Sequence, residues 1–141
     1  MRKLLLVLLA LAGCQQLPLT PADIEARKFE PVPDKAVIYL VRDTADFSDA
    51  ETIVVLENIQ VSTDSGTYFR WVVPPGKHLI TGWGADSGRI TVDVARGRIY
   101  FIKQSVTGTR VPMSFFSVVS EAEGRGVVSR SVLVKSQKTL Q

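Results

Sequence analysis

The chain has 141 residues, of which 17 are basic and 14 acidic, with one cysteine and one histidine. The lone cysteine has no second one to pair with, and with a single histidine too few ligands remain for a zinc or copper site. The basic residues are scattered along the chain without a run, which argues against nucleic-acid binding. We therefore expect one domain that folds around its own apolar core, without a cofactor.

The first segment has the layout of a secretory signal. Met1 to Lys3 is positively charged, and residues 4–11 form an unbroken apolar run. Eight helical residues span about 12 Å, whereas the hydrocarbon core of a bilayer is roughly 30 Å thick. The run is therefore too short to be a permanent membrane span.

The end of this run, Leu11-Ala12-Gly13-Cys14, resembles the lipobox of bacterial lipoproteins. The resemblance implies that the signal peptide 1–13 is removed and that Cys14 carries a diacylglycerol and a further acyl chain, palmitate-like lipids that anchor the protein in a membrane. The alternative is an ordinary signal peptide with a cysteine near its end. Gln15 is not an aspartate, which by the sorting pattern of Gram-negative lipoproteins favours the periplasmic face of the outer membrane.

Removal of the signal would also take away Arg2 and Lys3, which lowers the net charge from +3 to about +1. Residues 14–34 contain four of the seven prolines and are predicted to be a lipidated tether. Within it, Thr20 is a candidate helix N-cap and Pro21 a first helical residue, so we expect about two turns of helix. A disordered spacer is the alternative.

From residue 36 the pattern changes to β-strands separated by turns. Residues 36–42 are apolar on both faces, which predicts a central strand covered on both sides. Residues 89–95 alternate, with Ile90, Val92 and Val94 expected to point inward. The predicted strands are 36–42, one or two within 51–62, 67–73, 77–81, 89–95, 98–106, 113–120 and a last one in 131–135.

Turns recur about every ten residues, which is typical of an all-β sandwich or barrel. We predict an antiparallel β-sandwich of about seven strands in residues 35–135, followed by a tail at 136–141. Ser120 and Glu123 match a capping box and predict a short helix near 121–130, which Gly124 and Gly126 each weaken by roughly 1 kcal/mol. Pro74-Pro75-Gly76 predicts a type II turn with a positive φ at Gly76.

Four segments resemble a family of small bacterial lipoproteins that share a domain of unknown function. They are KAVIYLVRD at 35–43, GTYFRWVVPPGKHLI at 66–80, GRIYFIKQ at 97–104 and EAEGR at 121–125. PPGKH and GRIYF also resemble prealbumin-like and PEGA-like sandwich modules. The resemblance implies a periplasmic β-sandwich and brings no known activity or catalytic residue. The sequence departs from the family at NIQVSTDSG, where a DG hairpin is common.

Catalytic chemistry has little support in this sequence. A Ser-His-Asp hydrolase would need His78 as its base, but no G-x-S-x-G elbow is present and His78 follows a tight turn. We expect its ring to pack at the sheet edge and to hydrogen-bond a nearby backbone group. Nearly all the acidic residues that could form a carboxylate pair read as solvated loop residues, and we predict that the protein is not an enzyme.

The binding interpretation rests on Trp83, which lies between two glycines at a loop tip. Together with Asp86 and Arg89, and with His78 as a further candidate, it could stack on a sugar or fill a partner's pocket. The alternative is that Trp83 folds back to cap the sandwich. We expect binding or structural association in the cell envelope, with recognition of a cell-wall glycan such as peptidoglycan as the second hypothesis.

Overall fold

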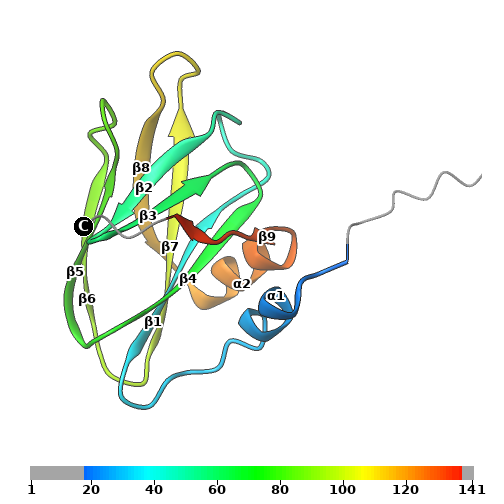
Figure 1. The fold of residues 1–141 in the computed structure, drawn as a ribbon, viewed down its shortest axis with the longest axis vertical. Coiled ribbons are helices and arrows are strands. Elements are labelled where there is room, and N and C mark those ends of the chain that lie inside the picture. Colours follow the sequence, from blue (N-terminus) through cyan, green and yellow to red (C-terminus); the bar gives the residue numbers. More distant parts are fainter. Residues whose placement is uncertain (1–17, 138–141) are drawn as a thin grey trace, which may run out of the picture.

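The computed structural model describes residues 18–137, which form two five-stranded sheets and two helices (Figure 1). The helices are α1 (Pro21–Ala26) and α2 (Glu121–Ser129). The first sheet has the order β8 (Met113–Val119), β7 (Ile99–Thr107), β1 (Ala36–Arg42), β4 (Thr67–Val73), β9 (Val132–Leu133). The second sheet has the order β10 (Ser136–Gln137), β3 (Ile59–Thr63), β2 (Thr52–Leu56), β5 (Gly76–Gly82), β6 (Arg89–Val94).

The two sheets share an apolar core, in a sandwich-like arrangement. Ile38 and Leu40 of β1 pack in one buried cluster with Val54 of β2 and Ile80 of β5. The alternation predicted for residues 89–95 is also present, because Val92 and Val94 are buried while their neighbours Thr91 and Asp93 are exposed. The mostly β prediction is confirmed, since about half of the described residues lie in strands.

The number of strands and their directions differ from the prediction. The described residues contain ten strands rather than about seven, because residues 51–62 fold as the β2–β3 hairpin and the C-terminal segment adds two strands of two residues. The first sheet is mixed rather than antiparallel, since β1 pairs with β7 and β4 pairs with β9 in parallel. The β2–β3 turn has no glycine, and Glu57 instead adopts a positive φ of 56°.

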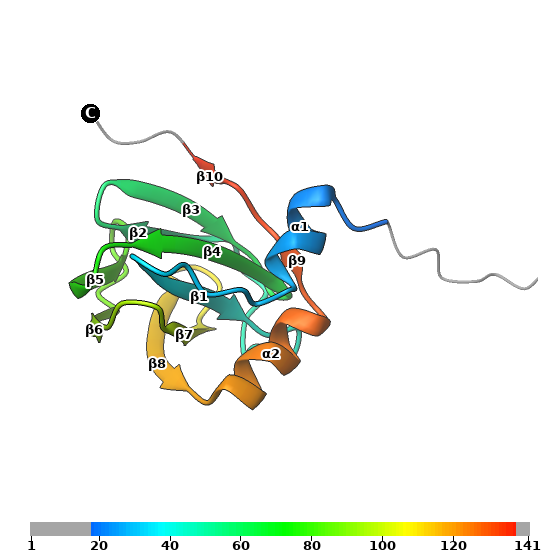
Figure 2. The same ribbon diagram turned by 90° about the horizontal axis from the view of Figure 1, so that it is seen from below.

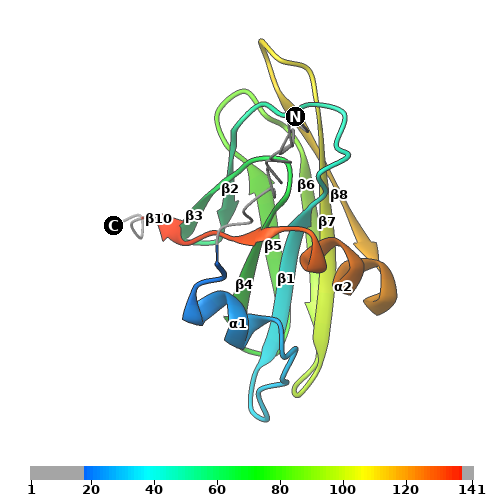
Figure 3. The ribbon, with the colours of Figure 1, turned by 90° about the vertical axis from the view of Figure 1, so that its right-hand side faces the viewer.

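The outer face of the first sheet is covered by both helices (Figure 3). Tyr39 of β1 and Phe101 of β7 form a second buried cluster with Ala26 of α1 and with Val127 and Val128 of α2. All seven residues of β1 are buried, so the predicted central strand, covered on both faces, is confirmed.

Helix α2 begins as the capping box predicts, because the Glu123 amide donates to the Ser120 hydroxyl at 3.2 Å. Glycine is needed at position 124 for packing, although it lowers the helix propensity. A Cβ atom at this position would lie 2.2 Å from the ring of Phe101, so glycine permits the helix to approach the sheet closely. At Gly126 the nearest such atom is 3.6 Å away, which is ordinary contact.

Helix α1 starts at the predicted cap, where the Thr20 hydroxyl accepts from the Asp23 amide. The described part of the expected tether packs against the domain rather than only linking it to the membrane, however. Asp23 and Ala26 are buried against the first sheet, and the hydroxyl of Tyr39 donates to the carbonyl of Ala26 at 2.6 Å. The packed unit therefore extends at least to α1, beyond the boundary at residue 35 that the composition suggested.

The turn between β4 and β5 has the positive φ that was predicted at Gly76. Its value is 130°, further from zero than the 80° of an ideal type II turn. A Cβ atom here would meet no heavy atom within 4 Å, so the conformation rather than the available space favours glycine.

Candidate functional site

Three loops meet at one end of the sandwich, the upper end in Figure 1, and we call them the loop end. They are residues 43–51 between β1 and β2, residues 83–88 between β5 and β6, and residues 108–112 between β7 and β8. Each carries a large apolar side chain in solvent: Phe47 is 83% exposed, Trp83 53% and Val111 57%. The side chains come from three separate loops but share one end of the fold.

A buried guanidinium group holds the first of these loops. Arg42, at the end of β1, is 0% exposed and donates through Nε to Asp46 at 2.7 Å. It also donates to the carbonyls of Ser48 and Ala50 at 2.5 and 2.8 Å, so one side chain binds three points along the loop. Asp46 in turn accepts from the amide of Val106 on β7, at 3.1 Å. The loop is thus fixed from within the sandwich.

The side chains buried directly beneath the loops are polar, unlike the apolar side chains of the rest of the core. Gln104 of β7 is 0% exposed, and its amide group donates to the hydroxyls of Thr52 and Ser114 at 2.9 Å. Its carbonyl oxygen accepts from Thr63 at 2.8 Å. Because these groups satisfy one another, the layer joins both sheets without a large desolvation cost. We call this set, with Arg42 and Asp46, the buried polar layer.

Asp86 holds the second loop against β8. Its Oδ1 accepts from the amides of Gly88 and Ser114, each at 2.9 Å, which ties the loop to the start of β8. Its Oδ2 is buried and has no hydrogen-bond partner among the described residues. The third loop is bound to the first, because the Ser48 hydroxyl donates to the carbonyl of Gly108 at 2.9 Å.

A cavity of about 350 Å³ opens between these loops. Trp83 and Asp86 line it from the second loop, Arg110 and Val111 from the third, and Glu51 from the end of the first. An aromatic ring with charged groups of both signs can stack on a ligand and orient it by hydrogen bonds. The cavity has the volume of a site for one small group.

The predicted binding residues are only partly brought together. Trp83 and Asp86 share the cavity, and Trp83 is exposed rather than folded back as a cap. Arg89 lines a neighbouring cavity, beside Phe115 and Phe116 of β8. His78 lies near the opposite end of the fold, beside the turn at 74–76.

His78 has the structural surroundings that were expected of it. Its Nε2 lies 2.7 Å from the carbonyl oxygen of Pro74, its Nδ1 contacts the carboxylate of Glu57, and the ring packs edge-on against Trp71 at 5.4 Å. Strand β5 lies between β2 and β6, but its pairing with β2 covers only residues 80–82, so His78 pairs with Val92 of β6 alone, at a local edge of the sheet. No serine or threonine hydroxyl hydrogen-bonds to it within residues 18–137.

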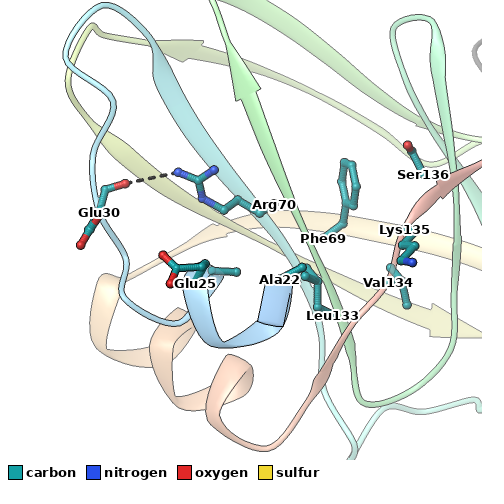
Figure 4. Close-up of a pocket in the computed structure, with 10 residues that line it drawn as sticks. Ala22, Glu25, Glu30, Phe69, Arg70, Leu133, Val134, Lys135 and Ser136 are labelled. Atoms are coloured by element: carbon teal, nitrogen blue, oxygen red, sulfur yellow. Dashed lines mark hydrogen bonds between the residues drawn. The ribbon is translucent and has the colours of Figure 1, made fainter. Parts of the chain in front are cut away.

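A larger groove lies elsewhere, between α1 and the segment after β9, with a volume of about 670 Å³ (Figure 4). Figure 4 shows Arg70 of β4 pointing toward the carbonyl of Glu30, and Glu25 and Lys135 on the two walls. Glu25 already pairs with Lys28 at 2.7 Å. We interpret this groove as the seam where α1 docks, since its aromatic residue, Phe69, is only partly exposed and packs against the core, unlike the exposed Trp83 of the loop end.

Asp23 is the centre of this docking. It accepts from Arg27 at 2.6 Å, from the hydroxyl of Tyr68 at 2.6 Å and from the amide of Leu133 at 3.1 Å. Burial acts to raise the pKa of Asp23, but the hydrogen bonds from Arg27 and Tyr68 outweigh it and lower that pKa below its usual value. Burial, together with the Asp23 carboxylate, raises the pKa of Tyr68 well above that of free tyrosine.

Phe47, Arg110 and Val111 were not singled out from the sequence. Phe47 was recognisable, because it is the only large apolar residue in the polar stretch from Asp43 to Glu51. Arg110 and Val111 had no such signal, since their position depends on how three loops meet.

Other site classes find no support in the described residues. Between residues 18 and 137 no three His, Cys, Asp or Glu side chains are grouped to hold a metal ion. Neither described helix has the length and apolarity of a membrane-spanning helix. Cys14, the predicted lipidation residue, lies outside the described residues.

The chain was compared with protein families, curated proteins and solved structures. No protein-family model, curated protein or solved structure that was compared with the chain matches it.

Proposed function

We propose that this protein is a lipid-anchored protein of the bacterial cell envelope that binds a partner protein through its loop end. The anchor is the lipid on Cys14, supported by the charged start, the apolar run and the lipobox-like Leu11-Ala12-Gly13-Cys14. Gln15 supports the periplasmic face of the outer membrane as the location. The activity is binding without catalysis.

The observation that carries the binding proposal is the exposure of Phe47, Trp83 and Val111 on three loops at one end. A single exposed apolar residue is ordinary, but several at one place with a polar rim are typical of an interaction surface. A buried ion pair contributes little net stability compared with apolar packing. The Arg42–Asp46 pair is therefore better explained by the order it gives to the loop that carries Phe47.

The anchor is tested by the substitution Cys14→Ser. We expect the variant to lose fatty-acid labelling and to leave the membrane fraction in detergent partitioning. The matched control is Ser129→Cys, at an exposed position, which should leave the labelling unchanged. Ser131 is less suitable for this control because its side chain is buried. Continued labelling of the Cys14→Ser variant would rule out this lipid site.

The binding surface is tested by chemical cross-linking in cells, followed by mass spectrometry. We expect a partner adduct with the native chain and its loss when Phe47, Trp83 and Val111 are all changed to Ser. The matched control changes three exposed apolar residues elsewhere, Leu19, Val72 and Val132, to Ser. An adduct that survives the loop-end change but not the control change would refute the proposal.

A second candidate is recognition of a cell-wall glycan at the same end. The observation that favours it is the cavity of about 350 Å³ that Trp83 shares with Asp86 and Arg110. An exposed indole ring can stack on the apolar face of a sugar, and the two charged groups can bind its hydroxyls.

The two tryptophans of the chain make this alternative simple to test. Trp71 is 6% exposed and Trp83 is 53% exposed, so a ligand at the cavity should change the fluorescence of Trp83 alone. Peptidoglycan fragments titrated into the full chain in detergent should shift the emission, and Trp83→Phe should abolish the shift. If intact peptidoglycan fails to sediment the protein, the glycan hypothesis is excluded and partner-protein binding remains.

A further inference from the structure

Strand β8 is an edge of the first sheet, because it pairs with β7 on one side and no described strand hydrogen-bonds to it on the other (Figure 2). Strand β6 of the second sheet lies beside β8 without pairing with it. An edge strand presents unpaired backbone groups, and natural proteins protect such edges with charges, prolines or covering segments. The other edge strands follow this rule. β6 carries Arg89 and Asp93, and β9 and β10 have only two residues each, with Lys135 between them.

Beyond its first residues, where the 83–88 loop lies against it, β8 lacks this protection. No charged residue occurs from Val111 to Ser120. Phe115 and Val118 are each 60% exposed, and they point to opposite faces of the sheet because they differ by an odd number of positions. The strand therefore exposes apolar side chains on both faces beside a free backbone edge.

The hydrogen bonds of the neighbouring residues show which backbone groups are free. The amide of Ser114 donates to Asp86, on the side away from β7. Since backbone groups alternate along a strand, the amides and carbonyls of Phe116 and Val118 also point away from β7. The loop that holds Asp86 covers the Ser114 end, because a Cβ atom on Gly88 would lie 2.0 Å from the Ser114 carbonyl oxygen. The free part of the edge is thus centred on Ser117.

We propose that β8 is a dimer interface, at which a second copy of this chain pairs antiparallel through the same strand. With Ser117 opposite its own counterpart, Phe116 faces Val118 of the other copy and exchanges two backbone hydrogen bonds with it, and the same occurs at the symmetric position. On the other face Phe115 lies opposite Val119 of the second copy. Pairs of an aromatic and a β-branched residue are favourable cross-strand neighbours.

A second copy fits this edge better than an unrelated strand for two reasons. Both strands are uncharged from 111 to 120, so pairing removes no charge of either strand from water. The pairing is also closed: the same patch is used on both copies, and the covered Ser114 end stops further strands from adding. The first sheet of one copy and the first sheet of the other would then form one continuous sheet. This inference is independent of the proposed partner at the loop end.

The test is the protein mass of the full chain, purified in detergent, measured by light scattering over a range of concentrations. We expect a dimer for the native chain and a monomer for Val118→Lys, with the dissociation constant raised at least about tenfold because a lysine would be buried without a partner. The matched control is Val132→Lys, since Val132 is also 60% exposed and lies on β9 at the opposite edge of the same sheet. It should remain dimeric.

A second variant keeps the test decisive if Val118→Lys fails to fold, as judged by circular dichroism. In Ser117→Cys the two new cysteines would face each other at a non-hydrogen-bonded position, with Cα atoms about 4.5 Å apart, close enough for a disulfide. Mild oxidation should link two chains, whereas Thr91→Cys on β6 and the unaltered chain with Cys14 alone should not link. A native chain that is monomeric at all concentrations, a folded Val118→Lys dimer, or open-ended polymers would each overturn the proposal.

Discussion

The two ends of the sandwich are built in different ways. At the loop end, three loops are held by buried polar side chains, with Arg42 and Gln104 each 0% exposed. At the opposite end the chain reverses through short turns at Glu57, Gly76 and Gly97, each of which has a positive φ. Positive φ angles also occur at the loop end, at Gly84 and Gly108. What distinguishes the loop end is its additional dependence on side chains that are distant in sequence.

This difference indicates that the loop end contains structure that is not needed simply to connect the strands. Short turns are sufficient to connect neighbouring strands, as the turn end demonstrates. The longer loops carry Phe47, Trp83 and Val111 into solvent and need the buried polar layer to stay ordered. Ordered loops with exposed apolar side chains on a rigid framework are typical of binding surfaces.

The largest expected effect is at the buried ion pair of the loop end. Arg42→Met should destabilise the protein by about 3–5 kcal/mol, because it leaves the carboxylate of Asp46 buried without its partner. Urea denaturation measures the loss. Arg110→Met, in an exposed loop position, is the matched control and should change stability by less than about 0.5 kcal/mol. A loss below about 1 kcal/mol for Arg42→Met would mean that the layer does not hold the loop.

At the turn end, Gly76→Val should cost about 1–3 kcal/mol, because a β-branched residue is strained at a positive φ. No clash contributes, since the space beside Gly76 is empty to 4 Å. Thermal melts measure the effect. Pro75→Ala is a control that keeps the glycine. A neutral Gly76→Val variant would show that the turn relaxes to another conformation.

His78→Ala should cost less, about 1 kcal/mol, through loss of its hydrogen bond to Pro74 and its contact with Trp71. It should leave binding and any cellular phenotype unchanged, because the ring lies at the other end from Trp83. The melt and an envelope-integrity assay check the two parts. A stable His78→Ala variant with the phenotype of a deletion would contradict the structural role.

Acid should loosen the loop end before the turn end. Two hydrogen bonds from Arg130 hold the pKa of Asp43 well below its usual value. Because the pKa of Asp43 is lower in the folded state, its ionised carboxylate stabilises the fold at any pH above about 4, the pKa of an aspartate in the unfolded chain. This stabilisation is lost as the pH falls from about 4 toward the folded-state pKa. The hydrogen-exchange protection factors of residues 43–51, which correct for the pH dependence of intrinsic exchange, should therefore fall at pH 3 relative to pH 6, with those of the turn end little changed. Arg130→Gln should remove this difference.

The smallest effect on stability is expected at the exposed side chains of the loop end. Phe47→Ser should change the free energy of unfolding by less than about 0.5 kcal/mol, because the Phe47 side chain is mostly in solvent. Binding of the partner should fall nevertheless. Phe69→Ser, at a partly buried position that packs on the core, is the contrasting control and should destabilise the fold. A large loss of stability for Phe47→Ser would show that this residue belongs to the fold.

The strands could be predicted wherever periodicity and turn residues were strong. The predicted bounds of 36–42 and 67–73 are those of β1 and β4, and the cap at Ser120 starts α2. The sequence could not show that β7 returns beside β1 in parallel, because strand order depends on long-range contacts. The role of α1 was also missed, since only Asp23 and Ala26 of its six residues are buried.

The candidate site could be predicted in part for the same reason. Trp83 was recognisable from its place between two glycines, and Asp86 from its nearness in sequence. Arg42 carried no signal, because an arginine that ends a strand is usually solvated, and its burial follows from the folding of the 43–51 loop over it. The cavity beside Trp83 needs Arg110 and Val111 from a loop more than twenty residues away.

The most direct test compares the two ends by photo-cross-linking in living cells. A photoreactive amino acid replaces Phe47 at the loop end in one strain and Lys77, an exposed residue at the turn end, in another. We expect a discrete protein adduct from position 47 and none from position 77, with the first adduct weakened by Trp83→Ser. An adduct from position 77 alone, or equal adducts from both positions, would contradict recognition at the loop end.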